Sequence, residues 1–366
     1  MASWRDTPFT RKLGLSLPLV QAPMGGGPTT PSLVAAVSEA GGLGSIAGGY
    51  LSPTQIRAEI AAVRARTRRP FAVNLFVPER EPVDTPERLE PRLLEASRAA
   101  LRPLRDELGL PDPAPPVRFA EVFEEQLAVL IEERVACFSF TFGIPGAPAL
   151  DACRRAGIAL CGTATTVAEA IALADAGVDF VNTQGFEAGA HRGSFLLSEE
   201  RSLVGSLALV PQAVDALAPR SIPVLAAGGI MDGRGIAAVL VLGAQAAVLG
   251  TAFLRTKESG ANATWKAALA QGRDDSTALT RAFSGKAARG IRNRFTEKLA
   301  PVEGQLPPYP AQNALTRDIR AAAAKAGNAD YLSLWAGQGV ALARELPAGE
   351  LVALLARETE TALERL

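Results

Sequence analysis

The only histidine of the chain, His191, lies in the glycine-rich segment QGFEAGAHRG at positions 184–193. Histidine is the side chain whose unperturbed pKa lies closest to neutrality, so it is suited to proton transfer. The apolar run 177–181 precedes the segment, and loops that follow strands carry the chemistry of barrel enzymes. The pattern therefore predicts a catalytic His191. The alternative is a structural histidine bonded to a backbone carbonyl, and the glycines count against it because they let a backbone approach a ligand closely.

Glycine pairs follow two later apolar runs and indicate a phosphate site. The sequence reads AAGGI at 226–230 and LGTA at 249–252. Glycines allow backbone N–H groups to converge on an anion, and the hydroxyl of Thr251 can donate a further hydrogen bond. Barrels bind phosphate at the ends of strands seven and eight. Each pair alone fits a tight turn equally well, but together they predict a ligand with a single phosphate group.

Eight short apolar runs recur along the chain, and most are separated by stretches with helical spacing. Alternating strands and helices of this kind form parallel sheets. Eight such units predict a TIM (β/α)8 barrel, with an open, doubly wound sheet as the alternative fold. The predicted strands are 17–20, 42–47, 71–76, 135–142, 158–162, 178–184, 222–227 and 246–250.

Two regions exceed a minimal barrel. Residues 78–118 are dense in Pro, Glu and Arg, and residues 255–366 are alanine-rich with mostly helical patterning. We therefore assign residues 1–77 and 119–254 to the barrel, 78–118 to an insertion and 255–366 to a mostly helical cap. Such additions commonly cover the substrate and exclude water. A plug of the barrel or an oligomer contact is the alternative role.

Composition excludes several classes of function. The 366 residues include 38 basic and 38 acidic side chains, so no net field favours nucleic acid or an anionic membrane. The charged N-terminal stretch lacks the apolar run of a signal peptide, which predicts a cytoplasmic protein. Three cysteines without paired spacing and one histidine do not suit a disulfide framework or the usual zinc centre, so we expect no metal. The glycines of 42–48 fall inside a predicted strand, which argues against a dinucleotide fingerprint.

Several motifs together resemble the nitronate monooxygenase family, formerly called 2-nitropropane dioxygenases, in its bacterial class I form. The resemblance covers nearly the whole chain, and its ordered set of motifs is more specific than any one of them. It implies an FMN-binding TIM barrel that oxidises alkyl nitronates with O2 to a carbonyl compound and nitrite, without NAD(P)H. The motifs are QAPM at 21–24, GGLGS at 41–45, NLF at 74–76, the histidine segment, AAGGIMDGRG at 226–235, FSGKAARG at 283–290 and WAGQG at 335–339.

The resemblance also assigns roles to residues of this chain. His191 is implied as the catalytic residue, either as a base toward a neutral nitroalkane or as an electrostatic and hydrogen-bonding partner of a nitronate. Main-chain atoms would line the isoalloxazine, two amide side chains would hydrogen-bond the flavin, and strand-end residues would hold its phosphate. These cofactor-binding residues are Ala22, Pro23 and Met24, then Asn74 and Gln184, then Gly189, Gly228, Gly229, Leu249, Gly250 and Thr251.

The chain departs from the family pattern at two positions. Ala190 stands where a second glycine is usual, and Thr141 stands where some relatives have histidine, which puts two-histidine handling of the nitro group in doubt. Tyr309 and Trp335 fit either a substrate lid or a helical core. Two functional alternatives stay open: an NADH-dependent flavin reductase acting on quinones or enoyl thioesters, and a non-catalytic FMN-binding protein. The physiological substrate, including propionate 3-nitronate, and the oligomeric state are not determined by the sequence.

Overall fold

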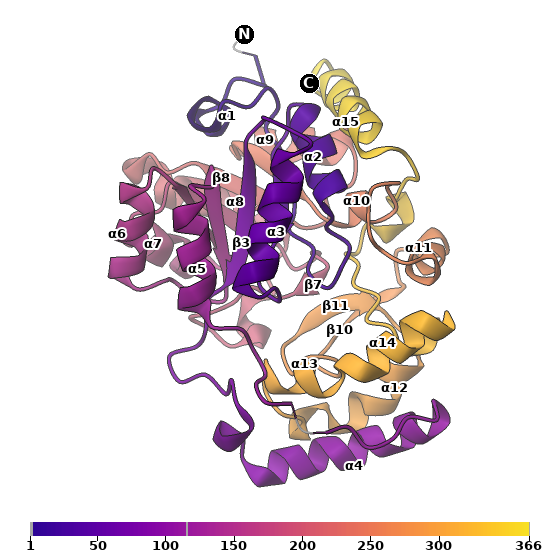
Figure 1. The fold of residues 1–366 in the computed structure, drawn as a ribbon. Coiled ribbons are helices and arrows are strands. Elements are labelled where there is room, and N and C mark those ends of the chain that lie inside the picture. The colour runs from indigo at the N-terminus through magenta and orange to yellow at the C-terminus, as the bar shows by residue number, and fades with distance from the viewer. Residues whose placement is uncertain (1–2, 115, 366) are drawn as a thin grey trace.

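A barrel of eight parallel strands forms the centre of the structure, a computed structural model that describes residues 3–114 and 116–365 (Figure 1). The strands pair in the order β1-β9-β8-β6-β5-β4-β3-β2, and a bridge between Val20 and Leu43 joins the first and last of them. The predicted TIM barrel is therefore confirmed. Its strands are β1 (Leu19–Gln21), β2 (Gly44–Ala47), β3 (Phe71–Phe76), β4 (Cys137–Thr141), β5 (Ala159–Ala164), β6 (Phe180–Gln184), β8 (Val224–Ala227) and β9 (Ala246–Leu249).

Amphipathic helices cover the outside of the barrel because most outward-facing side chains of the strands are apolar. Several of these helices begin at a side-chain cap, as at Ser52, whose hydroxyl forms a reciprocal capping box with Gln55. The covering helices are α2 (Pro31–Glu39), α3 (Pro53–Arg64), α5 (Phe123–Glu132), α6 (Ala147–Arg155), α7 (Val167–Asp175), α8 (Ser206–Leu217), α9 (Gly233–Val241) and the short α10 (Thr251–Leu254).

The two ends of the chain also pack on the barrel. Helix α1 (Pro8–Leu13) closes the amino-terminal end, where the Phe9 ring meets the edge of Phe180 at 5.0 Å between centroids. Helix α15 (Ala348–Leu363) lies against α2 and α9 on the outside of the barrel. The last part of the region that the sequence assigned to the cap therefore contributes to the barrel wall. No helix in the described part of the chain is long and apolar enough to cross a membrane.

Inward-facing side chains of the barrel form stacked layers, because alternate strands place their inward residues at the same height. The register of the eight strands assigns each inward residue to a layer. From the amino to the carboxyl end the layers are Leu43, Cys137, Phe180 and Ala246; then Val20, Ala72, Cys161 and Leu225; then Ser45, Ser139, Asn182 and Val248; then Ala22, Asn74, Thr163 and Ala227. Thr141, Gln184 and Gly250 lie above them at the mouth.

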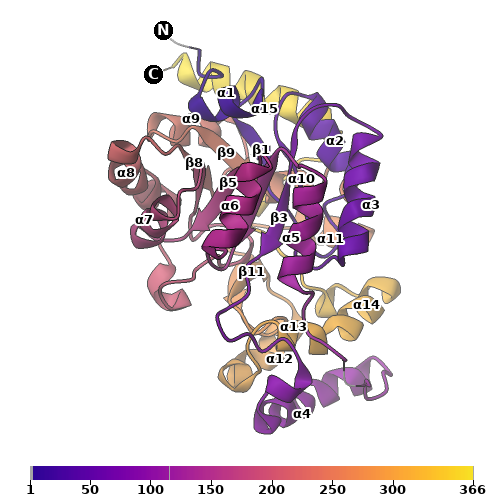
Figure 2. The same ribbon diagram turned by 60° about the vertical axis from the view of Figure 1, so that its left-hand side comes forward.

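A second unit, which we call the lid, covers the carboxyl end of the barrel (Figure 2). It combines the insertion with part of the C-terminal region, and both figures show α4 lying across α12 and α13. Leu101 and Leu104 of α4 share an apolar core with Phe283, Phe295 and Leu315. The lid helices are α4 (Pro91–Glu107), α11 (Ala263–Ala270), α12 (Arg294–Leu299), α13 (Ala311–Leu315) and α14 (Arg317–Ala326).

The lid also contains strands that the sequence did not indicate. β10 (Thr277–Thr280) and β11 (Ala288–Ile291) form an antiparallel hairpin, and β11 pairs with the two-residue β7 (Ala190–His191) of the histidine segment. The expected mostly helical region thus includes a small sheet. This sheet ties the lid directly to the loop that carries His191.

Candidate active site

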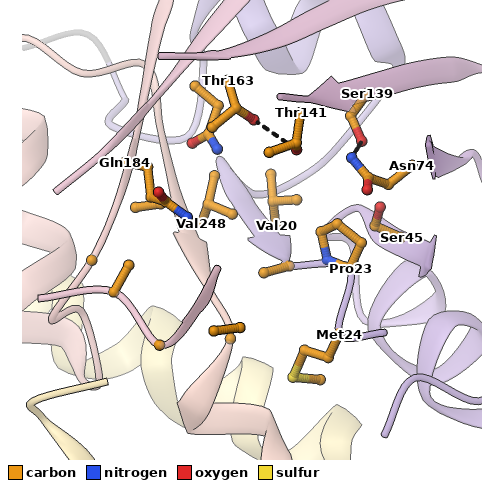
Figure 3. Close-up of a pocket in the computed structure, with 18 of the residues that line it drawn as sticks. Val20, Pro23, Met24, Ser45, Asn74, Ser139, Thr141, Thr163, Gln184 and Val248 are labelled. Carbon is orange, nitrogen blue, oxygen red and sulfur yellow. Dashed lines mark hydrogen bonds between the residues drawn. The ribbon is translucent and has the colours of Figure 1, made fainter. Parts of the chain in front are cut away.

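A cavity opens at the carboxyl ends of the barrel strands, and each of the eight strands contributes to its lining (Figure 3). Polar side chains from neighbouring strands form hydrogen bonds along its wall. The Asn74 amide donates to the Ser139 hydroxyl at 3.0 Å, and the hydroxyls of Thr141 and Thr163 lie 3.4 Å apart. The lining includes all but one of the residues that the sequence assigned to the site. They are Ala22, Pro23, Met24, Asn74, Gln184, Gly189, His191, Gly228, Gly229, Gly250 and Thr251.

Leu249 is the exception. Its side chain is fully buried in the core between the barrel and the outer helices, on the face of β9 that points away from the cavity. Its carbonyl accepts a hydrogen bond from the backbone N–H of Ala22 at 2.8 Å. Because successive strand residues point to opposite faces, Leu249 supports the cavity wall without lining it.

Aromatic rings surround the imidazole of His191. Ring centroids of Phe142, Tyr309 and Trp335 lie 5.8, 5.5 and 5.8 Å from the centroid of its ring. Two residues at this place have positive φ angles that glycine adopts more easily, Ala190 at 61° and Phe142 at 78°. Such strained residues cluster at functional sites. Tyr309 and Trp335, for which the sequence left two roles open, therefore belong to the surroundings of the histidine.

Ser284 holds the imidazole. His191 Nε2 lies 2.8 Å from Ser284 Oγ, and the same hydroxyl donates to the carbonyl of Lys286 at 3.0 Å. Because that bond uses the hydroxyl proton, Ser284 Oγ accepts from an N–H at Nε2, which leaves Nδ1 of His191 unprotonated. The serine thus selects one tautomer of the neutral ring.

The environment of His191 opposes a positive charge on the ring. Burial, the positive charge of Lys286 and that of Arg320 together lower the pKa of His191 from 6.5 to about 3. The positive charge of Lys286 is partly balanced by the Glu199 carboxylate, which lies 3.7 Å from the ammonium group. The imidazole is therefore neutral at physiological pH, and the cationic side chains beside it favour an anionic ligand.

The His191 loop is fixed by buried side chains. Gln184 Nε2 donates to the carbonyl of His191 at 2.9 Å, and Gln184 Oε1 accepts from the N–H of Gly193 at 2.8 Å. Arg192 is fully buried, and its guanidinium donates to the carbonyls of Gly185, Gln184 and Ser202 at 2.7, 3.0 and 3.0 Å. Both ends of the Gln184 amide are thus engaged by the loop, which leaves its second amide hydrogen and the second lone pair of Oε1 for a ligand.

Glycines at the ends of β8 and β9 present backbone donors to the cavity. Gly228 and Gly229 have φ angles of 115° and 72°, which only glycine adopts without strain. Among the described residues, no hydrogen-bond acceptor faces the N–H groups of Gly229, Gly250 and Thr251. The Thr251 hydroxyl accepts from the N–H of Gly337 at 2.9 Å, so its proton is available as a further donor. This cluster of donors suits an anion such as a phosphate group.

The absence of a side chain at Gly189 lets the His191 loop pack closely against the lid. A Cβ atom there would lie 2.6 Å from the backbone of Ala336 and Gly337, too close for any side chain. Gly337 and Gly339 themselves line the cavity. Reasoning from the sequence missed these two glycines and Ser284, although they lie in the FSGKAARG and WAGQG stretches that carried the family resemblance.

A model of the nitronate monooxygenase family matches residues 7–358 of the chain. The chain belongs to the nitronate monooxygenase family. It is therefore an oxidoreductase of an enzyme family that acts on small nitronates, as the motifs indicated.

Relatives of known sequence or structure align over nearly the whole length of the chain. A probable nitronate monooxygenase of Staphylococcus haemolyticus (strain JCSC1435) is 43% identical over 362 residues, which are 98% of this chain and 99% of the relative. The crystal structure of nitroalkane oxidase from Streptomyces ansochromogenes superposes with a TM-score of 0.87 at 43% identity, covering 98% of this chain and 99% of the other. FabK from Thermotoga maritima superposes with a TM-score of 0.76 at 27% identity, covering 98% of each chain.

Proposed function

We propose that this protein binds FMN and uses O2 to oxidise alkyl nitronates to a carbonyl compound and nitrite. The backbone donors at Gly229, Gly250 and Thr251 converge on one place at the cavity and match one phosphate group. Pro23, Met24 and the Asn74 amide would contact the ring system. Bound FMN supplies the electron acceptor, which no protein side chain provides.

The low pKa of His191 and the cationic side chains near it favour an anionic substrate. A general base works best with a pKa near the operating pH, whereas the pKa of His191 is lowered to about 3. A nitronate already lacks the proton that a base would remove from a nitroalkane. Lys286 and Arg320 create a positive field at the ring, and this field stabilises a bound anion. The site thus favours a preformed nitronate over a neutral nitroalkane, and it extends to nitronates that carry a second anionic group, such as propionate 3-nitronate.

The residues around His191 enclose this anion. Phe142, Tyr309 and Trp335 exclude water on the other sides of the imidazole. The tautomer set by Ser284 leaves Nδ1 without a proton, so the attraction for a nitronate comes from the cationic side chains and not from a hydrogen bond of the ring. Exclusion of water strengthens the interaction between the cationic groups and the nitronate.

The decisive experiment mixes the purified, FMN-loaded protein under anaerobic conditions with an alkyl nitronate, with the parent nitroalkane and with NADH, each in a separate reaction. The flavin absorbance spectrum is recorded over time. We expect rapid bleaching by an alkyl nitronate, much slower bleaching by the parent nitroalkane, and nitrite after air is admitted. A protein that bleaches as fast with the nitroalkane as with the nitronate would contradict the argument from the low pKa of His191.

An NADH-dependent reductase of quinones or enoyl thioesters is the second candidate. Support comes from the structural likeness to FabK at 27% identity and from the shared barrel, although the likeness to nitroalkane oxidase is closer. Fast bleaching by NADH together with an inert nitronate would establish the reductase. A flavin that is reduced by none of the three compounds would favour the non-catalytic FMN-binding alternative.

A further inference from the structure

The cavity continues into the barrel below the level of Asn74 and Gln184, the two amide side chains that the family resemblance assigns to the flavin. All four side chains of the second layer, Val20, Ala72, Cys161 and Leu225, line it. Bulky branched residues usually fill this part of a TIM barrel and make it solid. Here alanine and cysteine occupy two of the four positions, so the interior is hollow at this height.

The walls of this deep part are apolar. Val20, Ala72 and Leu225 carry no polar side-chain atom, and burial raises the pKa of the Cys161 thiol to about 12, so the thiol is un-ionised. Phe9 of α1 forms the floor and seals the amino-terminal end against Phe180. A buried water needs two to four polar partners, and empty apolar cavities instead admit small apolar molecules such as xenon.

The layer directly above is polar. Ser45 Oγ and Asn182 Oδ1 have no hydrogen-bond partner among the described residues, and both side chains belong to this third layer. Buried polar atoms of this kind mark a place for water or for a polar edge of a ligand. The polar layer therefore separates the cofactor level from the apolar space beneath it and limits that space to small, uncharged molecules.

We propose that the space enclosed by Val20, Ala72, Cys161 and Leu225 is a binding chamber for molecular oxygen beneath the flavin site. O2 is small and apolar, and it is the oxidant in the proposed function, on which this inference rests. The chamber lies inside the barrel, whereas His191 lies on the loop after β6 at the carboxyl end, where the substrate would bind. Oxygen and nitronate then need not compete for one space.

Xenon under pressure in crystals of the FMN-loaded protein tests the chamber without any turnover. We expect a xenon peak between the four side chains of the second layer in the wild type and none in Ala72→Leu, whose larger side chain fills the space. The matched control is Ala246→Val, because Ala246 also faces the barrel interior and is buried but does not line the cavity. The control should keep the peak.

Rapid mixing of reduced enzyme with O2 tests the role of the chamber. We expect the second-order rate constant for flavin reoxidation to fall about tenfold in Ala72→Leu, because the filled chamber no longer holds O2. Anaerobic reduction by nitronate should stay within about twofold of wild type, since the substrate side is untouched. If Ala72→Leu fails to fold, Cys161→Met fills the same space from the neighbouring wall.

Ordered water in place of xenon in the second layer, or a wild-type reoxidation rate in a variant whose chamber is filled, would overturn the proposal. Failure of the proposed function gives a different result. Reduced wild-type enzyme would then not react with O2 at all, whereas the xenon peak would still report whether the chamber exists.

Discussion

Replacement of Ser284 by alanine tests whether one hydrogen bond fixes the tautomer of the His191 imidazole and whether the proposed activity depends on it. Ser284 is 1% exposed, and its hydroxyl lies 2.8 Å from His191 Nε2. Alanine removes this partner and leaves the enclosed Nε2 proton unbonded. An unsatisfied buried donor costs about 1–3 kcal/mol. If about 2 kcal/mol of this is lost in the transition state, kcat/KM for a nitronate falls roughly 30-fold, since 1.36 kcal/mol corresponds to a factor of ten.

The assay is steady-state oxidation of a nitronate by protein with measured FMN content. Ser97→Ala is the matched control, because Ser97 is also fully buried and its hydroxyl makes a hydrogen bond of the same 2.8 Å length, to Gln312 in the lid. Both variants should lose similar thermal stability, whereas only Ser284→Ala should lose activity. A wild-type kcat/KM in Ser284→Ala, or an equal loss in both variants, would refute the assignment of Ser284 to the imidazole.

Four further substitutions test other parts of the site. Ala190→Gly should raise the free energy of unfolding in urea by about 1 kcal/mol, because it relieves the positive φ of 61°. Gly229→Asp should abolish FMN binding in a fluorescence titration by placing a carboxylate among the phosphate donors; unchanged affinity would move the phosphate elsewhere. The pKa of His191 is lowered from 6.5 to about 3, so between these pH values the unfolded chain binds more protons than the folded one. The free energy of unfolding therefore falls on acidification, by at most about 1.4 kcal/mol per pH unit. His191→Asn should flatten this acid limb in denaturation curves, and an unchanged slope would mean that His191 titrates normally. Arg192→Met should destabilise the protein by about 3–5 kcal/mol, because buried carbonyls lose a charged donor, whereas the exposed Arg201→Met should be neutral.

The barrel was predictable from the sequence because a parallel strand is buried on both faces and appears as a short apolar run. All eight predicted runs overlap the observed strands; for example, the run 222–227 contains β8 (Val224–Ala227). The lid hairpin was not predictable. The sequences TALT and ARGI of β10 and β11 carry no clear alternation. These strands are defined by tertiary pairing, of β10 with β11 and of β11 with β7.

Reasoning from the sequence pointed to cavity-lining residues that follow strands and missed those that arrive from elsewhere in the chain. His191 and the strand-end glycines are recognisable because local glycine content marks a backbone that approaches a ligand. Ser284 lies 93 positions from His191, and only the folded hairpin brings the two together. The family resemblance placed Leu249 among the cofactor-binding residues together with Gly250 and Thr251. The alternation of the strand turns the Leu249 side chain away from the cavity.

The shared core of the lid constrains how substrate preference can diverge among relatives. Arg105 of the insertion is 4% exposed and makes two hydrogen bonds with Asp318 of the C-terminal region, 213 positions away, at 2.7 and 2.9 Å. Tyr309 and Trp335, whose rings lie beside that of His191, belong to the same C-terminal region as Asp318. A sequence change that reshapes their surroundings therefore alters the surface on which α4 rests. We therefore expect a chimaera that exchanges one segment without the other to have a mismatched interface close to His191.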